Sequence, residues 1–465
     1  MTRWREIPVW LVLAITVTLW AYRPIWNIDI FWHIATGRVI LESGIPDTDI
    51  FAPPLIRGDW TPFQWGYEAF VAWIDDNFGL TALRWIHASI VGVAAGLFGF
   101  WSREKGASIL ASLATVTIFV CLFEDRIRVR PHLFEPMFVL LTILACRRGK
   151  ASILALLIAP IWANIHAVSS LWWIAIFGAW TLSERTSRTY LILATGIAAI
   201  AISPGALEGL TGALSSHSEW PAEFVPELKP IFAYATEGAW GFLILTMVAG
   251  GIVCSILTVM RSKDTYRKIL SVGCALAAVV LARWAFFAAI PIAIFVQSSL
   301  EKNRIVYWVA IGATTASLAL HVGPRWSVND RATDIQANTF PESAVDFMEA
   351  TNIKVPTDTT GAWAGYLLYR LHPPATVIAD GRLVFSAAVA DLLRRRSGGD
   401  STTFDEAVGY FHTQALLRPT GTTPPLSEDR WLLVYSDEIA ELWLPSPAWL
   451  PERMEAIEQW NTERQ

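Results

Sequence analysis

The sequence predicts a polytopic α-helical membrane protein with a small additional domain at its C-terminal end. Three observations predict this class. Of the 465 residues, 54% are hydrophobic and only 17% are charged, whereas soluble domains usually carry about a quarter charged residues. Within residues 1–321 the apolar residues gather in runs about as long as a membrane-crossing helix. The chain also contains 24 tryptophans, and tryptophan favours membrane–water interfaces.

About eleven apolar runs are expected to be transmembrane helices of roughly 17–20 residues each. The first run, residues 7–22, is not followed by a small-residue cleavage site. We therefore interpret it as a retained helix rather than a signal peptide. The other runs are residues 81–101, 106–123, 132–146, 151–165, 168–183, 189–203, 232–260, 268–282, 284–300 and 305–321.

Basic residues indicate the orientation, because short cytoplasmic loops carry an excess of Lys and Arg. Here they recur in every second loop. We therefore expect a multi-pass protein of the bacterial inner (plasma) membrane, with a cytoplasmic N-terminus and a periplasmic or extracellular C-terminal end. The basic positions are Arg3, Arg5, Arg103, Lys105, Arg147, Arg148, Lys150, Arg185, Arg188, Arg261, Lys263, Arg267, Lys268, Lys302 and Arg304.

The predicted membrane domain covers residues 1–324, and its first outer loop is residues 23–80. In this loop residues 31–41 and 63–75 carry apolar and aromatic side chains at helical spacing. Both are expected to be amphipathic helices in the membrane interface.

Residues 325–465 have the composition of a soluble domain, with turn signals between short apolar segments. Residues 431–443 are typical of two short strands flanking Ser436-Asp437-Glu438. We expect a small α/β or α+β domain outside the membrane.

Asp29 directly follows the first apolar run and lies among aromatic residues. A carboxylate at that depth is costly unless it is hydrated, paired or used. One interpretation is that it caps the helix that starts near Phe31. The other is that it acts as a general base or orients an acceptor. His33 lies one helical turn further on, so it would face the same side as Asp29, either as a substrate contact or as a hydrogen-bonding wall residue.

A second constellation is the outer loop that contains Arg126, Arg128 and Arg130. In an extended segment these alternate residues project to one side. They would then either pair with acidic residues and lipid head groups, or hold a phosphate or pyrophosphate through bidentate guanidinium contacts.

Five further residues are candidate substrate contacts. Arg283 interrupts an apolar stretch and marks either a hairpin turn or a polar cavity, where it would be a second phosphate ligand. Asn164 and His166 stand at an outer end of a run and would satisfy backbone groups or line the same cavity. Glu219 is either a helix end or an acidic pocket residue. Arg382 follows Asp380-Gly381, a turn signal, and has either a structural role or an anionic ligand.

The sequence contains no pattern that requires a metal or a nucleotide. The four cysteines lie in or at the edges of apolar runs and lack C-x-x-C or Cys/His spacing. The glycines near residue 361 lack the strand–turn–helix context and the basic residue that bind phosphate.

The set of motifs resembles the GT-C superfamily of integral-membrane glycosyltransferases, which includes protein O-mannosyltransferases and oligosaccharyltransferase catalytic subunits. It is most similar to uncharacterised bacterial glycosyltransferase-like membrane proteins. The motifs that carry this resemblance are Asp29-Ile30-Phe31-Trp32-His33, Arg130-Pro131-His132-Leu133-Phe134, Trp162-Ala163-Asn164-Ile165-His166, Glu219-Trp220, Trp363-Ala364-Gly365-Tyr366-Leu367 and Asp380-Gly381-Arg382.

This resemblance implies a transferase that moves a sugar from a polyprenyl-phosphate carrier to an unknown acceptor outside the membrane, with Asp29 as the acidic catalytic residue. It leaves a divalent metal open, although Asn27 stands where the similar proteins have the first acidic residue of D-x-D. A catalytically inactive GT-C-like scaffold, or a subunit of a larger membrane complex, is the alternative. A transporter ranks last, because few ionisable residues lie deep within the runs. Nothing in the sequence suggests nucleic-acid binding.

Overall fold

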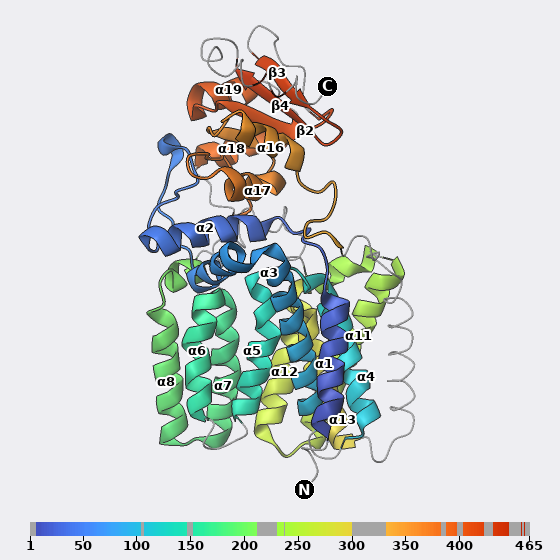
Figure 1. Ribbon diagram of the computed structural model, residues 1–465. Helices are drawn as coiled ribbons and strands as arrows, with labels where there is room; N and C mark the ends of the chain where they lie inside the picture. The colour runs from blue at the N-terminus through green and yellow to red at the C-terminus, as the bar shows by residue number, and fades with distance from the viewer. Residues whose placement is uncertain are drawn as a thin grey trace. The chain divides into compact units, whose positions relative to one another are not determined.

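The structure is a computed structural model and is mostly helical, with one small sheet (Figure 1). Its described residues divide into two compact units. Unit 1 takes residues 1–24 and 81–332, and unit 2 takes residues 25–80 and 333–465. The described residues are 6–103, 107–146, 152–211, 230–236, 238–299, 332–382, 387–397, 403–422, 431–445, 457 and 460.

Unit 1 consists of helices, and one lies in every predicted apolar run except residues 305–321, which lie outside the described part of the chain. Two helices, Trp65–Ser102 and Gly238–Arg261, are long and apolar enough to cross a membrane; the expected number of spans stays a prediction. The elements are α1 (Ile7–Ala21), the end of α3 (Trp65–Ser102), α4 (Ile109–Phe123), η4 (Glu124–Arg126), η5 (Pro131–Phe134), α5 (Glu135–Cys146), α6 (Ser152–His166), η7 (Val168–Ser170), α7 (Leu171–Glu184), α8 (Ser187–Ala201), η9 (Ile231–Thr236), α11 (Gly238–Arg261), α12 (Thr265–Val280), η10 (Ala282–Ala288) and α13 (Ala289–Ser299).

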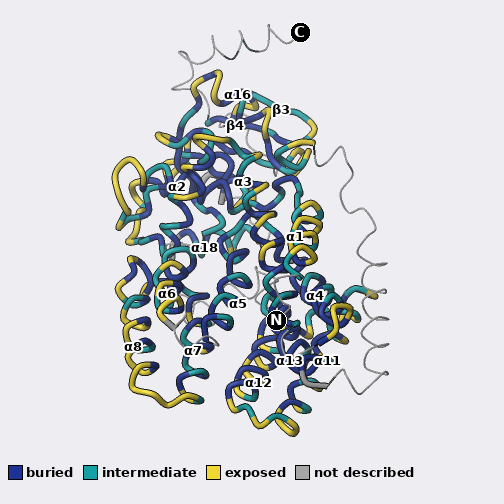
Figure 2. Tube along the Cα trace, turned by 60° about the horizontal axis from the view of Figure 1, so that its bottom comes forward, coloured by how far each residue is buried: buried dark blue, intermediate teal, exposed yellow. Residues whose placement is uncertain are grey.

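The helices of unit 1 pack side by side in a bundle. Helix α7 contacts α5, α8 and α12, and α11 contacts α12 and α13 (Figure 1). Large aromatic side chains such as Trp162 and Trp173 are fully buried between helices. The outer helices instead carry exposed residues, as α8 does in Figure 2, and on α8 these include Leu191 and Ile197. Exposed apolar faces of this kind are what a lipid environment requires.

Three breaks in the helical run of unit 1 hold most of the candidate residues. Elements η4 and η5 separate α4 from α5, η7 separates α6 from α7, and η10 separates α12 from α13. Pro131 begins η5, where its missing N–H leaves no hydrogen bond unmade. Leu281 has an extended backbone between α12 and η10. At such breaks the side chains of unit 1 can converge from several helices.

Unit 2 combines the first outer loop with the C-terminal residues. Its sheet has the order β1-β2-β4-β3, with β1 parallel to β2 and the other pairs antiparallel. The two strands expected in residues 431–443 are present as β3 and β4. The elements are α2 (Asp29–Ser43), η2 (Pro54–Ile56), the start of α3, α16 (Glu342–Ala350), β1 (Thr357–Thr359), α17 (Gly361–Leu371), α18 (Ala387–Ser397), α19 (Thr403–Phe411), β2 (Ala415–Pro419), β3 (Trp431–Ser436) and β4 (Ala440–Pro445).

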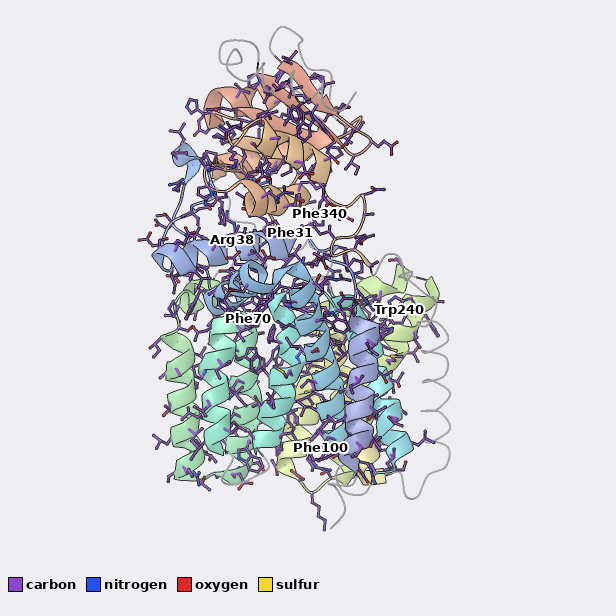
Figure 3. The ribbon with its side chains drawn as sticks, viewed as in Figure 1. Phe31, Arg38, Phe70, Phe100, Trp240 and Phe340 are labelled. Carbon is purple, nitrogen blue, oxygen red and sulfur yellow. The ribbon has the colours of Figure 1, made fainter. Side chains whose placement is uncertain are left out.

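The expected helix 31–41 is present as the longer α2, and it packs against α17 within unit 2. The Phe31 ring lies 4.9 Å from that of Phe340 and 5.0 Å from that of Tyr366, and Figure 3 shows Phe31 and Phe340 close together. The expected helices 63–75 and 81–101 are the two parts of α3, which changes direction at Gly79 (φ 74°, ψ 176°). A positive φ there is favourable only for glycine.

Candidate functional site

Asp29 is the first residue of α2, and the preceding N-cap residue, Ile28, makes no side-chain cap hydrogen bond. The Asp29 side chain is half-buried. A carboxylate in the first turn is favoured by the positive end of the helix dipole. The C-terminal residues of unit 2 approach this carboxylate closely: a Cβ atom placed on Gly381 would lie 3.0 Å from Asp29 Oδ1.

His33 is buried and bonded to a carboxyl group that sequence reasoning did not assign to it. Its Nδ1 lies 3.1 Å from Oε1 of Glu68, and the two side chains are 2% and 0% exposed. The rings of Trp32 and Tyr67 lie 3.6 Å and 5.2 Å from the imidazole. Glu68 belongs to the second predicted interfacial helix, residues 63–75, and His33 to the first. The signal in the sequence for this pair was one ionisable residue in each of two neighbouring amphipathic helices.

Arg382 lies in a buried cluster in unit 2, where its side chain is 4% exposed. Its Nη2 atom is 2.8 Å from Asp49 Oδ1 and 2.6 Å from Asp380 Oδ2. Its guanidinium carbon lies 4.8 Å from the ring centre of Phe51 and 4.5 Å from that of Trp60. Asp380 and Asp49 raise the pKa of Arg382 although burial lowers it. The structure thus places Arg382 between two carboxylates; its expected contact with substrate stays a prediction.

The arginine loop of unit 1 is not the extended segment that the alternating pattern suggested. After η4, the N–H of Arg128 donates to the carbonyl of Arg126 and the N–H of Arg130 to that of Arg128, each over 2.8 Å. Such bonds close three-residue turns. Arg126 is buried, and Arg128 and Arg130 are half-buried.

Arg126 and Arg283 nevertheless act on the same neighbours. Both lie within electrostatic range of His132, Glu135 and His166, and the His132 and His166 rings are 4.6 Å apart. We call Arg126, Arg283, His132, His166 and Glu135 the unit 1 polar cluster. Arg130 also acts on His132. Sequence reasoning did not single out Glu135; a carboxylate at the start of an apolar run was the signal for it.

The remaining candidates have local partners. Asn164 donates to the Pro160 carbonyl over 2.8 Å and accepts from the Ser203 hydroxyl over 2.5 Å. His166 Nδ1 accepts from the N–H of Ser169 over 3.1 Å, at the start of the turn that links α6 to α7. Arg283 lies over the Trp284 ring at 5.3 Å. Glu219 lies outside the described residues.

Within the residues that the structure describes, no three His, Cys, Asp or Glu side chains are grouped as a metal site would require. Asn27, which stands at the first position of the expected acidic pair, is buried with 3% exposure. The described residues thus offer the Asp29 carboxylate at the start of α2, the buried groups around His33 and Arg382 in unit 2, and the unit 1 polar cluster.

Comparison with known proteins identifies the fold. No family model matches the sequence, and no curated protein matches it. Solved structures do match. The apo oligosaccharyltransferase of Archaeoglobus fulgidus has a TM-score of 0.59 at 10% identity, and the match covers 90% of this chain and 69% of that one. ArnT from Cupriavidus metallidurans, solved with undecaprenyl phosphate, has a TM-score of 0.54 at 12% identity, over 96% and 98% of the two chains.

A third match is the arabinofuranosyltransferase AftD from Mycobacteria, with a TM-score of 0.56 at 14% identity; it covers 96% of this chain and 40% of AftD. These neighbours are integral-membrane GT-C glycosyltransferases that use lipid-linked sugars. At such low identity the likeness shows the fold and not the reaction. It confirms, at the level of fold, the resemblance that the motifs suggested.

Proposed function

Because the chain has the GT-C fold, we propose that it is a membrane glycosyltransferase that moves a sugar from a polyprenyl-phosphate carrier to an acceptor on the outer face of the membrane. The observation that supports this most is the grouping of three arginines, the buried Arg126 and the half-buried Arg130 and Arg283, near His132, in a chain whose fold is that of lipid-linked sugar transferases. Its structural neighbours include proteins solved with undecaprenyl phosphate and with a dolichol-phosphate.

In this proposal Asp29 accepts the proton of the acceptor hydroxyl or amine as that group attacks the anomeric carbon. The bond between that carbon and the carrier phosphate breaks, and its electron pair leaves with the phosphate. Asp29 suits the role because it is half-buried at a helix start. Its carboxylate also lies close to Gly381, where an added Cβ atom would be 3.0 Å from Asp29 Oδ1. A base held near the attacking atom contributes about 10²–10⁴-fold to the rate.

The carrier phosphate is assigned to Arg126, Arg128, Arg130 and Arg283. Fixed cations stabilise the negative charge that develops on a leaving group, and guanidinium groups bind phosphate oxygens in pairs. His33, Asn164, His166 and Glu219 remain candidate substrate contacts, whereas Arg382 already pairs with Asp49 and Asp380. A divalent metal is not needed for this scheme.

The alternative is a GT-C-like scaffold without activity. Two observations favour it: Asn27 replaces an acidic residue, and the Glu135 carboxyl faces the same arginines that would hold the phosphate. A cluster in which a carboxyl group accompanies the arginines can be purely structural.

Asp29→Asn tests the proposal, since it keeps the shape of the side chain and removes the base. The purified variant should lose at least a hundredfold in transfer from polyprenyl-phosphate sugars. We expect polyprenyl phosphate to co-purify with the wild type, measured by mass spectrometry, and the variant should retain it. Full turnover in Asp29→Asn would refute the role of Asp29. A wild-type protein that binds no polyprenyl phosphate and transfers no sugar would establish the scaffold.

A further inference from the structure

The C-terminal residues of unit 2 hold the helix that begins with Asp29. The N–H of Ile25 donates to the carbonyl of Asp334 over 2.8 Å, and the N–H of Gln336 donates to the carbonyl of Ile25 over 2.9 Å. These two bonds fix the chain four residues before Asp29. The start of α2 is therefore set partly by residues that follow it by about three hundred positions in the sequence.

Two glycines bring the C-terminal residues into direct contact with the start of α2. A Cβ atom on Gly365 of α17 would lie 2.9 Å from the carbonyl oxygen of Ile28 and 3.2 Å from the nitrogen of Trp32. A Cβ atom on Gly381 would lie 3.0 Å from Asp29 Oδ1 and 3.4 Å from Trp32 Nε1. Gly381 does not have a positive φ. The constraint at position 381 is therefore one of space and not of backbone conformation: an added methyl group would be tight against the carboxylate, and one of the two would have to shift by a few tenths of an ångström.

The turn that carries Gly381 is fixed by the Arg382 cluster. Asp380 Oδ1 accepts from the backbone N–H of Arg382 over 2.8 Å, and both carboxylate oxygens of Asp380 accept from Arg382 Nε, over 3.0 and 2.8 Å. Asp49 holds the same guanidinium from the first outer loop. That loop is itself hydrogen-bonded to the C-terminal residues, because the N–H of Val377 donates to the carbonyl of Phe51 over 2.9 Å.

We propose that the turn Asp380-Gly381-Arg382 is a positioning element for the Asp29 carboxylate. Arg382, paired with Asp49 and Asp380 and enclosed by Phe51 and Trp60, acts through protein rather than by contact with substrate. Arg382 fixes the turn, and Gly381 within the turn then restricts the movement of the Asp29 side chain. This rests on the proposed role of Asp29 as base. It makes the C-terminal residues part of the acceptor-activating machinery rather than a cover over it.

Gly381→Ala is the sharpest test, because it adds one methyl group 3.0 Å from Asp29 Oδ1. Displacement of a reacting group by about 1 Å lowers rates by about a hundredfold. We therefore expect kcat to fall about tenfold to a hundredfold while KM for the polyprenyl-phosphate sugar stays the same. Amide hydrogen exchange should rise in peptides that cover residues 28–36. The matched control is Gly409→Ala in the same unit, where an added Cβ meets nothing within 4 Å.

Arg382→Lys is a second variant, which tests the proposal if Gly381→Ala does not fold. It keeps the positive charge between Asp49 and Asp380 but loses the planar fork. Its kcat should fall, again without a change in donor KM. Wild-type kcat and exchange in a folded variant would overturn the proposal, and so would an equal loss in Gly409→Ala. If the wild type shows no transfer at all, the proposed function fails, and the exchange data alone still decide whether the turn holds the start of α2.

Discussion

Asp29 and His33 lie one helical turn apart on α2, yet the structure gives them different surroundings. Asp29 is half-buried at the start of the helix, whereas His33 is enclosed and bonded to Glu68. The spacing of the two residues could be read from the sequence. The partner of His33 could not, because it lies 35 positions away and the pairing depends on how α2 crosses α3. The same holds for one partner of Arg382: Asp380 lies two positions before it in the sequence, but Asp49 comes from the first outer loop.

The bond between His33 and Glu68 gives a prediction at this scale. Removing one partner of a buried hydrogen bond leaves the other unsatisfied, which costs about 1–3 kcal/mol. Glu68→Ala should therefore destabilise the protein by about that amount, measured as a lower midpoint of thermal unfolding in detergent. Glu68→Gln keeps an oxygen that accepts from the imidazole and should cost less than half as much. Equal losses in the two variants would contradict a specific bond.

At the scale of elements, hydropathy and helical spacing predicted where helices lie but not how they pack. The run at residues 31–41 is extended by two residues at each end in α2, and the two predicted helices around residue 79 are joined into α3 with a kink. The arginine loop combines two three-residue turns with an extended backbone at Arg130, a combination that the alternation of arginines alone does not predict. Close contacts between helices depend on small residues, and the hydropathy pattern does not predict which residues will lie opposite them.

Adjacent glycines in α11 isolate the effect of such a contact. A Cβ atom on Gly251 would lie 2.8 Å from the carbonyl oxygen and from the Cβ of Ala288, whereas one on Gly250 would meet nothing within 4 Å. Gly251→Ala should destabilise the protein by about 1–3 kcal/mol through overpacking. Gly250→Ala should be neutral or stabilising by up to about 1 kcal/mol, since alanine favours a helix. Thermal unfolding of the two variants in the same detergent measures the difference in stability. If Gly251→Ala is as stable as Gly250→Ala, η10 shifts to make room for the added methyl group and the expected overpacking is absent.

For the molecule as a whole, composition and the basic loops predicted a helical membrane protein, and the fold comparison agrees with a GT-C architecture. The predicted division at residue 324 differs from the two compact units, because residues 25–80 fold with the C-terminal residues. No composition change marks that association.

The predicted orientation can be tested with single cysteines. Glu438→Cys, in the exposed turn between β3 and β4, should react with a membrane-impermeant maleimide on intact spheroplasts. Lys263→Cys, in a loop expected in the cytoplasm, should react only after permeabilisation. Both positions are exposed; three of the four native cysteines are buried and the fourth, Cys254, is half-buried, so a variant without Cys254 gives the background. Labelling of Lys263→Cys from outside would reverse the predicted orientation.

The composition of unit 2 from two distant segments has a consequence for synthesis. Residues 25–80 leave the ribosome first, and their partners begin only at residue 333, after the 252 residues 81–332 of unit 1. At about 5–20 residues per second, roughly 13–50 s pass between residue 80 and the first C-terminal residues of unit 2, and α17 and the sheet follow later still. During that interval Phe31 of α2 lacks the three aromatic rings that it contacts in the structure, those of Phe340, Tyr366 and Tyr369. The surroundings of Asp29, the proposed base, are therefore complete only after the C-terminal residues of unit 2 have been translated.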